Sequence, residues 1–189
     1  MVIATSLLLL SLTACGTPPW EKAGAGGTPK PSPSGTITMI KNDLASGSTR
    51  RLLEAGTIGV TVDYWSDLAM KSWTAGANKP LSFSLTGALT PDDGQQVYLS
   101  KVSAVVAVMA GSKALPSPAT LSDQASISPG YLIKSPYSYS QTFVLPALDP
   151  KATSVTLDLT YELLLQTTPT SVQYAKQTAT DTLTIAIAR

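Results

Sequence analysis

The chain contains no histidine and only one cysteine among its 189 residues. Without histidine, the Ser-His-Asp and Cys-His forms of nucleophilic catalysis are excluded, as are zinc and copper sites with histidine ligands. A single cysteine cannot form an internal disulfide, so the fold must be stabilised by its core alone. The sequence also lacks the Ser-x-x-Lys and Gly-x-Ser-x-Gly motifs, which excludes the serine–lysine mechanism and the nucleophile elbow.

Charge is also scarce. Charged residues make up 13% of the chain, about half of the ~25% typical of soluble domains. The 13 Lys and Arg residues nearly balance the 12 Asp and Glu residues, which gives a net charge of +1. This balance provides no electrostatic reason to expect nucleic acid or an anionic membrane surface as a partner.

The cysteine follows an apolar segment near the start of the sequence. Residues 2–12 read VIATSLLLLSL and contain no charge. At ~1.5 Å per residue, a helix of this length is too short to cross a bilayer core of ~30 Å. The length is that of the apolar core of a secretion signal, which is followed by small residues at a processing site.

The four residues Leu12-Thr13-Ala14-Cys15 resemble the lipobox of bacterial lipoproteins. The resemblance implies that residues 1–14 are a signal peptide and that Cys15 carries the lipid and becomes the first residue of the mature chain. It also implies a location in the cell envelope, anchored to the membrane and facing outside the cytoplasm. Because Gly16 follows the cysteine, the resemblance implies the outer membrane in a cell with two membranes.

A linker separates the cysteine from the rest of the chain. Residues 16–35 contain five Pro and five Gly among twenty residues and have almost nothing to bury. Such a composition is typical of a solvated, partly extended tether. We therefore predict a lipidated cysteine and tether over 15–35 and one folded domain over 36–189.

From residue 36 onward, apolar residues mostly alternate with polar ones, which is typical of strands with one buried and one wet face. The segment 155–165 is the clearest, with Leu159 and Tyr161 on its predicted inner face and Thr160 and Glu162 on its outer face. Residues 95–109 become apolar on both faces after Val102, which predicts a deeply buried strand, with a helix as the alternative. Residues 50–54, RRLLE, are compatible with one helical turn. The other predicted strands are 58–64, 81–85, 137–145, 183–187 and a weak one at 36–41.

Seven or eight strands with no β-α-β spacing indicate a single antiparallel β-sandwich, an all-β fold. The segment LLEAGTIGVTV, residues 52–62, is similar to the entry into the second strand of immunoglobulin-like and fibronectin-III-like domains. The cysteine pair of the immunoglobulin family is absent. The resemblance concerns architecture and implies no function.

Carboxylates are the only remaining candidates for catalysis, since a pair of them can hydrolyse glycosides. Asp158 and Glu162 are predicted on the outer face of one strand, ~13 Å apart, as expected of a solvated face. Asp92-Asp93-Gly94 is predicted to be a hairpin tip, and as a calcium site it is a weak signal. We expect no catalytic residue, metal or cofactor. The other acidic candidates are Asp63 and Asp67.

Aromatic residues near inter-strand connections form another kind of candidate site. Exposed aromatics on loops at the end of a sandwich suit protein or sugar contact. The alternative is that they fill the edge of the core and the bases of the loops. The candidates for surface contact are Tyr64, Trp65, Trp73, Tyr137 and Tyr139.

These observations predict a lipid-anchored envelope protein that is a non-enzymatic structural or protein-interaction module. Its expected partners are the membrane, through Cys15, and another envelope protein or polymer. The first alternative is a ligand-binding or transport-accessory lipoprotein, for which a cavity between the sheets would be needed. An acid-based hydrolase is the second.

Overall fold

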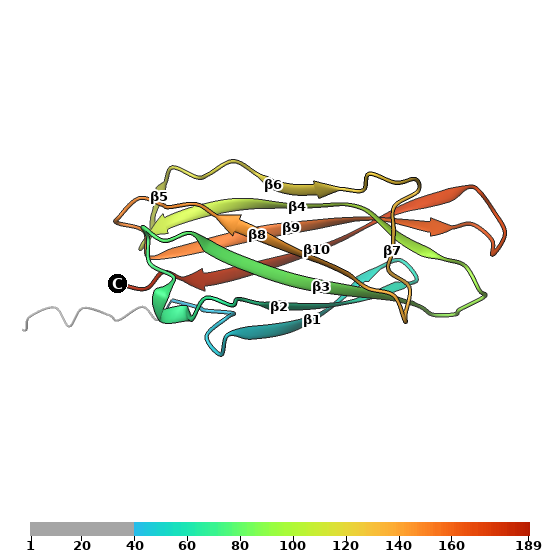
Figure 1. The fold of residues 1–189 in the computed structure, drawn as a ribbon, viewed down its shortest axis with the longest axis horizontal. Helices are drawn as coiled ribbons and strands as arrows, with labels where there is room; N and C mark the ends of the chain where they lie inside the picture. Colours follow the sequence, from blue (N-terminus) through green and yellow to red (C-terminus); the bar gives the residue numbers. More distant parts are fainter. Residues whose placement is uncertain (1–39) are drawn as a thin grey trace, which may run out of the picture. The chain divides into compact units, whose positions relative to one another are not determined.

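The computed structural model describes residues 40–189, which form a sandwich of two antiparallel sheets (Figure 1). The first sheet has the order β1-β2-β3-β8 and the second the order β10-β9-β4-β5, with β6 and β7 also pairing with β4. The long strands are β1 (Ser48–Ala55), β2 (Ile58–Trp65), β3 (Lys79–Leu89), β4 (Val97–Ala110), β8 (Tyr139–Leu145), β9 (Ser154–Gln166) and β10 (Tyr174–Ala186). The short elements are the 3-10 helix η2 (Met70–Ser72) and the strands β5 (Lys113–Leu115), β6 (Leu121–Gln124) and β7 (Tyr131–Leu132).

The sandwich architecture predicted from the sequence is confirmed, with ten strands instead of seven or eight. Four of the strands were not predicted: β1, and the three strands β5, β6 and β7, which are two to four residues long and too short to show a period of two in the sequence. The order β2-β3-β8 against β10-β9-β4 corresponds to the ABE and GFC strands of an immunoglobulin-like sandwich. The segment 52–62 therefore belongs to an added edge strand and to the first strand of this order, not to the second.

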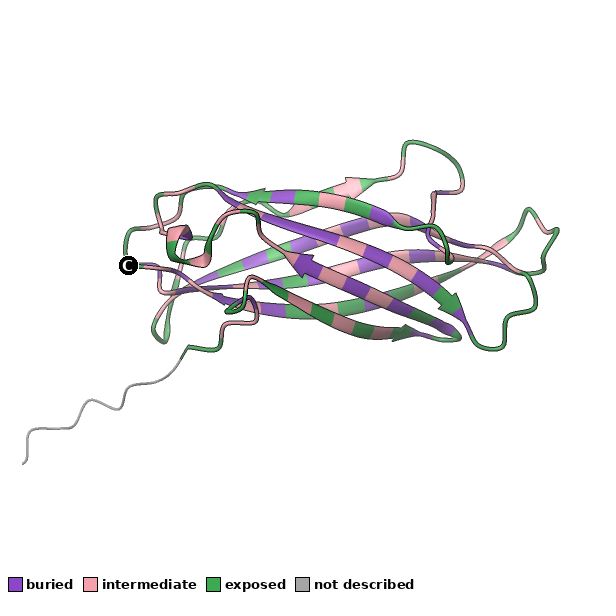
Figure 2. Ribbon diagram, turned by 60° about the horizontal axis from the view of Figure 1, so that its bottom comes forward, coloured by how far each residue is buried: buried purple, intermediate pink, exposed green. Residues whose placement is uncertain are grey.

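The alternating residues of the long strands build the core between the two sheets (Figure 2). On β9, Leu159 and Tyr161 are buried, whereas Thr160 and Glu162 lie on the outer face and are partly exposed. Phe83 of β3 is the centre of an aromatic cluster, with ring centroids 5.2–6.3 Å from its neighbours. The neighbours are Tyr64, Tyr139, Phe143 and Tyr161.

Three local expectations were wrong. Residues 50–54 lie in β1 and form no helical turn, because they pair with β2 along their whole length. Residues 40 and 41 are not in a strand, and the rest of the weak strand at 36–41 lies outside the described residues. Residues 97–110 form a strand, as predicted, but only one face is buried, because Val105 and Ala107 point outward into solvent.

The domain has two ends, which we call the entry end and the far end. The first described residues lie beside the end of β10, since the Asp43 N–H donates to the Thr184 carbonyl at 2.8 Å. The C-terminus lies at the same end, where the Ala188 N–H donates to the Trp73 carbonyl (Figure 1). The far end carries the loops 90–96, 125–138 and 167–173, which we call the far-end loops. In the described part of the chain, no helix has the length and hydrophobicity needed to cross a membrane.

Both ends of the core are closed by side chains from the connections. At the entry end, Trp73 is fully buried after η2, and its indole N–H donates to the Ser66 hydroxyl at 3.0 Å. At the far end, Ile133 is fully buried and links the sheets. Its N–H donates to the Val97 carbonyl and its carbonyl accepts from the Gly87 N–H.

Lys79 is also buried at the entry end, and within residues 40–189 it has no carboxylate partner. Its ammonium donates to four backbone carbonyls at 2.6–3.4 Å. Three of these carbonyls lie in the β2–β3 connection, and the fourth belongs to Pro146 after β8. Burial lowers the pKa of Lys79. One side chain thus fastens two loops of the entry end together.

The edge strands β1 and β10 meet along a polar seam. Arg51 of β1 donates to Asp43 at 2.7 Å, and its Nε atom lies 3.8 Å from Asp181 of β10. Burial favours a raised pKa for Asp43, but the Thr184 N–H, Lys41 and Arg51 outweigh it and lower the pKa. The seam therefore holds one side of the sandwich closed with charged hydrogen bonds rather than a backbone ladder.

Candidate functional site

The structure divides the five aromatic candidates between the core and the surface. Tyr64 and Trp73 are fully buried, and Tyr139 is buried at the edge of the core. Trp65 is half-buried on the outer face of β2, and Tyr137 is exposed in a far-end loop. Surface contact by Tyr64, Trp73 and Tyr139 was therefore a wrong prediction.

The buried tyrosines can lie in the core because their hydroxyl groups have hydrogen-bond partners there. The hydroxyls of Tyr64 and Tyr161 are 2.7 Å apart and bond to each other across the two sheets. Burial, the largest effect, raises the pKa of both groups. The Tyr139 hydroxyl donates to Asp123 at 2.6 Å, and its ring stacks on Tyr131 at 5.0 Å. Burial and the hydrogen bond to Asp123 raise its pKa, so these phenols are neutral structural groups.

Asp92 and Asp93 are not at a hairpin tip. They lie between β3 and β4, which belong to different sheets, so this loop crosses from one sheet to the other. The Asp92 carboxylate accepts from the Lys134 ammonium at 2.6 Å and from the Gly94 N–H at 2.9 Å. Both donors lower the pKa of Asp92, the Lys134 bond most. Asp92 therefore fastens two far-end loops together.

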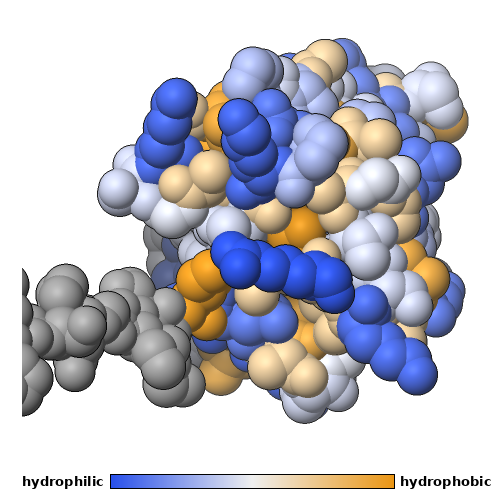
Figure 3. Space-filling view, turned by 90° about the vertical axis from the view of Figure 1, so that its left-hand side faces the viewer, coloured by the Kyte–Doolittle hydropathy of each residue, from blue (hydrophilic) through white to orange (hydrophobic). Residues whose placement is uncertain are grey.

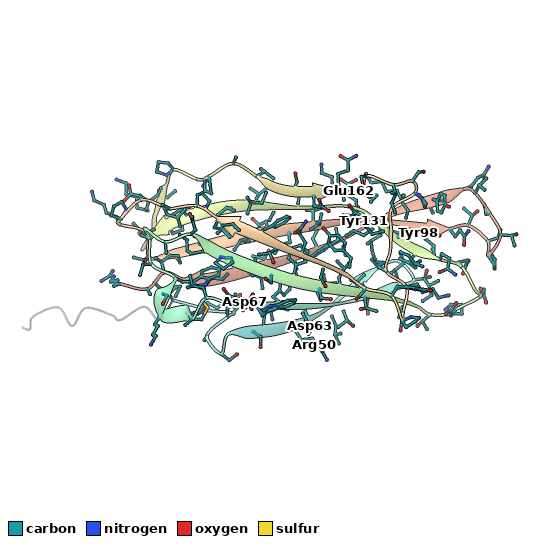
Figure 4. All side chains as sticks on the ribbon, in the orientation of Figure 1. Arg50, Asp63, Asp67, Tyr98, Tyr131 and Glu162 are labelled. Atoms are coloured by element: carbon teal, nitrogen blue, oxygen red, sulfur yellow. The ribbon has the colours of Figure 1, made fainter. Side chains whose placement is uncertain are left out.

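The other acidic candidates are spread over the surface. Asp63 forms two bonds with Arg50, and the two side chains lie together on β1 and β2 (Figure 4). Asp158 accepts from Thr182 at 2.8 Å, and Glu162 forms an ion pair with Lys176, both on the outer face of the second sheet. Asp67 is exposed at the entry end. Within residues 40–189, no three potential metal ligands of the His, Cys, Asp or Glu type come together.

The far-end loops carry several large apolar side chains that are exposed to solvent. Val172 is 87% exposed, Ile127 60% and Tyr137 58%. The loops also contact one another, since a Cβ on Gly94 would lie 3.5 Å from the ring of Pro169. With Asp92 paired to Lys134, few free charges remain there. The far end thus presents apolar groups on loops that are tied to both sheets.

The entry end is richer in cations, although Ile40 is also exposed there. Hydrophilic side chains project from it, as Figure 3 shows. Three exposed or partly exposed carboxylates, Asp43, Asp67 and Asp149, accompany a larger number of cations, and Asp43 pairs with Lys41 at 3.2 Å. The exposed cations at this end are Lys41, Lys71, Lys113, Lys151 and Arg189.

Sequence reasoning missed the far-end apolar residues. Val172 and Ile127 are single apolar residues within polar, turn-forming segments, so no periodic pattern includes them. The sequence feature that could have indicated their exposure was an isolated apolar residue within a polar, turn-forming segment. Tyr137 was singled out as a candidate for surface contact, and the strand predicted to begin with it begins at Tyr139 in the structure.

One hollow among the described residues lies along β1 and β2, where Gly59 and Ala88 leave space beside Leu52. Its volume is about 320 Å³, and a second hollow of about 260 Å³ lies near Gly56 and Thr90. Neither lies between the sheets, where the ligand-binding alternative would need a cavity. Neither hollow combines several polar groups aimed at one point, as a small-molecule site would.

Comparison with protein-family models and with curated proteins finds no match for this chain.

Proposed function

We propose that this protein is a lipid-anchored, non-enzymatic module of the cell envelope that docks onto another envelope component through its far-end loops. Cys15, within its lipobox-like sequence, carries the lipid, although it lies outside the described residues. The entry end then faces the membrane, and the far-end loops face away from it. The far end is the surface presented to a partner.

The proposal rests on a difference in surface chemistry between the two ends of the domain. Three of the seven large apolar side chains that are exposed among the described residues, Val172, Ile127 and Tyr137, lie on the far-end loops, where a protein partner would bury them. Although the net charge of the chain is near zero, exposed cations outnumber carboxylates at the entry end, so this end would be attracted to an anionic surface. Such attraction complements a lipid anchor, because stable attachment takes more than one acyl chain or a second signal.

Changing Cys15 to Ser tests the anchor. We expect the variant to lose labelling by a fatty-acid probe and to leave the membrane fraction or remain uncleaved, since the hydroxyl cannot replace the thiol. Fractionation and probe labelling of the two proteins measure this. A Cys15→Ser protein that still labels and still sediments with membranes contradicts the lipoprotein assignment.

A photo-crosslinking residue at Tyr137 tests the docking end. We expect a discrete crosslinked product in intact cells that weakens when Val172→Ser and Ile127→Ser are combined, because these changes remove apolar surface from the same end. Val105→Ser is the matched control, since Val105 is exposed on the outer face of β4, away from both ends. Equal weakening by the control, or the same product from a crosslinker at Ser112 of the entry end, contradicts docking by the far end.

A further inference from the structure

Among the described residues, β1 is an edge strand that pairs with β2 on one side and with no strand on the other. The Ser66 N–H donates to the Gly47 carbonyl, which fixes the side of the strand that faces β2. In an antiparallel ladder the residues that bond to the partner alternate, so the backbone groups of residues 50, 52 and 54 point away from β2. Within residues 40–189, none of their three N–H groups has a hydrogen-bond acceptor.

The side chains of this edge are arranged symmetrically about Leu52. Leu52 is 79% exposed, with Arg50 two residues before it and Glu54 two residues after it. All three side chains lie on the outer face of the first sheet and are exposed. Arg50 already bonds to Asp63 beside it, at 2.6 and 2.9 Å (Figure 4). A cation, an apolar group and an anion therefore follow one another along an unpaired edge.

We propose that β1 pairs with β1 of a second copy of this chain, antiparallel and about a two-fold axis through Leu52. In this register, Leu52 faces Leu52 of the partner, and Arg50 faces Glu54 of the partner on both sides of the axis. The same register joins the free backbone groups of residues 50, 52 and 54 in both copies. An isologous contact of this kind is self-complementary and closes after two copies. It also removes an open edge of each first sheet.

Charge selects this register from its neighbours. A two-fold axis at residue 50, 51 or 54 would place Arg50, Arg51 or Glu54 against its own copy, which is unfavourable for directly opposed residues. An axis at Leu53 would leave Arg50 without an opposed Glu54. Only the axis at Leu52 forms two Arg–Glu pairs across the strands and also pairs two apolar side chains.

Cysteine substitutions in full-length Cys15→Ser protein test both the contact and the register. In Leu52→Cys, the two introduced thiols would lie on directly opposed residues, whose Cα atoms are ~5.5 Å apart and within reach of a disulfide. In Glu54→Cys, the matched control on the same exposed face, the two thiols would lie ~13 Å apart along the strands. We expect mild oxidation to form a covalent dimer of Leu52→Cys and little of Glu54→Cys. Equal crosslinking of the two variants, or none of Leu52→Cys, overturns the proposal.

Sedimentation of the Cys15→Ser protein over a range of concentrations gives the second measurement. We expect reversible dimers, which Arg50→Glu weakens by opposing two carboxylates and which Arg50→Glu combined with Glu54→Arg restores. Thermal melting of each variant checks that it is folded. A protein that stays monomeric at every concentration overturns the proposal, and so does a dimer that the charge changes do not affect. Because these measurements need neither lipid nor far-end partner, their outcome is independent of the proposed function.

Discussion

Replacing Trp73 with alanine should lower the free energy of unfolding by about 3–5 kcal/mol. The indole is fully buried at the entry end, so its loss leaves a large cavity at one end of the core. The Ser66 hydroxyl also loses the indole N–H as a donor. Urea unfolding followed by far-ultraviolet circular dichroism measures the change without depending on tryptophan fluorescence.

Trp65→Ala is the matched control, because Trp65 is the last residue of β2, close to the same connection, but is half-buried on the outer face. We expect its loss to be clearly smaller than that of Trp73→Ala, since less of its ring is removed from water. Equal losses at the two positions would contradict the assignment of Trp73, rather than Trp65, to the core.

Leu159→Ala should cost about 2–5 kcal/mol, the usual range for a buried leucine. Leu159 is buried on the inner face of β9, the central strand that pairs with both β4 and β10. Its outward neighbour Thr160 makes no side-chain hydrogen bond within the described residues, so Thr160→Ala should change stability by within about half a kcal/mol. Urea midpoints of the two variants, at unchanged slope, measure both effects.

Leu164→Ala provides the control for this strand. Leu164 lies on the outer face of β9 and is only partly buried. Its replacement should therefore cost less than that of Leu159. A larger loss at Leu164 than at Leu159 would show a helical pattern of burial through this segment and would contradict the strand.

The alternation of apolar and polar residues was enough to predict the sandwich and the inner face of β9. Side chains of a strand point to opposite faces in turn, so a sheet with one buried face imprints its period directly on the sequence. The same alternation already placed Tyr64 on one face with Ile58, Val60 and Val62. The prediction of surface contact by Tyr64 conflicted with that pattern, which placed its side chain on the inner face. In the structure Tyr64 is buried, as the pattern indicated.

What the sequence could not predict depends on contacts between distant segments. Residues 50–54 contain good helix formers, yet pairing with β2 makes them a strand. Trp73 lies in a connection with no periodicity, and the C-terminal segment, whose Ala188 N–H donates to the Trp73 carbonyl, lies far from it in the sequence. Asp92 and Asp93 have the composition of a hairpin turn, but local composition does not tell whether two successive strands share a sheet.

The candidate site was harder to predict than the fold for the same reason. The gathering of exposed apolar residues at the far end depends on the course of three loops that lie far apart in the sequence. Tyr137 could be singled out as an aromatic residue near a connection. Val172 and Ile127 can be recognised as parts of a candidate contact surface only when the fold shows that their loops lie at the same end of the domain.

The course of β1 determines how the domain would respond to mechanical tension. β1 begins at the entry end and runs toward the far end, and it is joined to β2 over eight residue pairs. A pull between a membrane-held entry end and a partner held at the far end acts along the strands, whereas the hydrogen bonds of the ladder lie across them. Those bonds are then loaded in shear and must fail together, instead of opening one after another as in peeling. Arg51, bound to Asp43 ahead of the strand, adds a further tie at the point where the load enters.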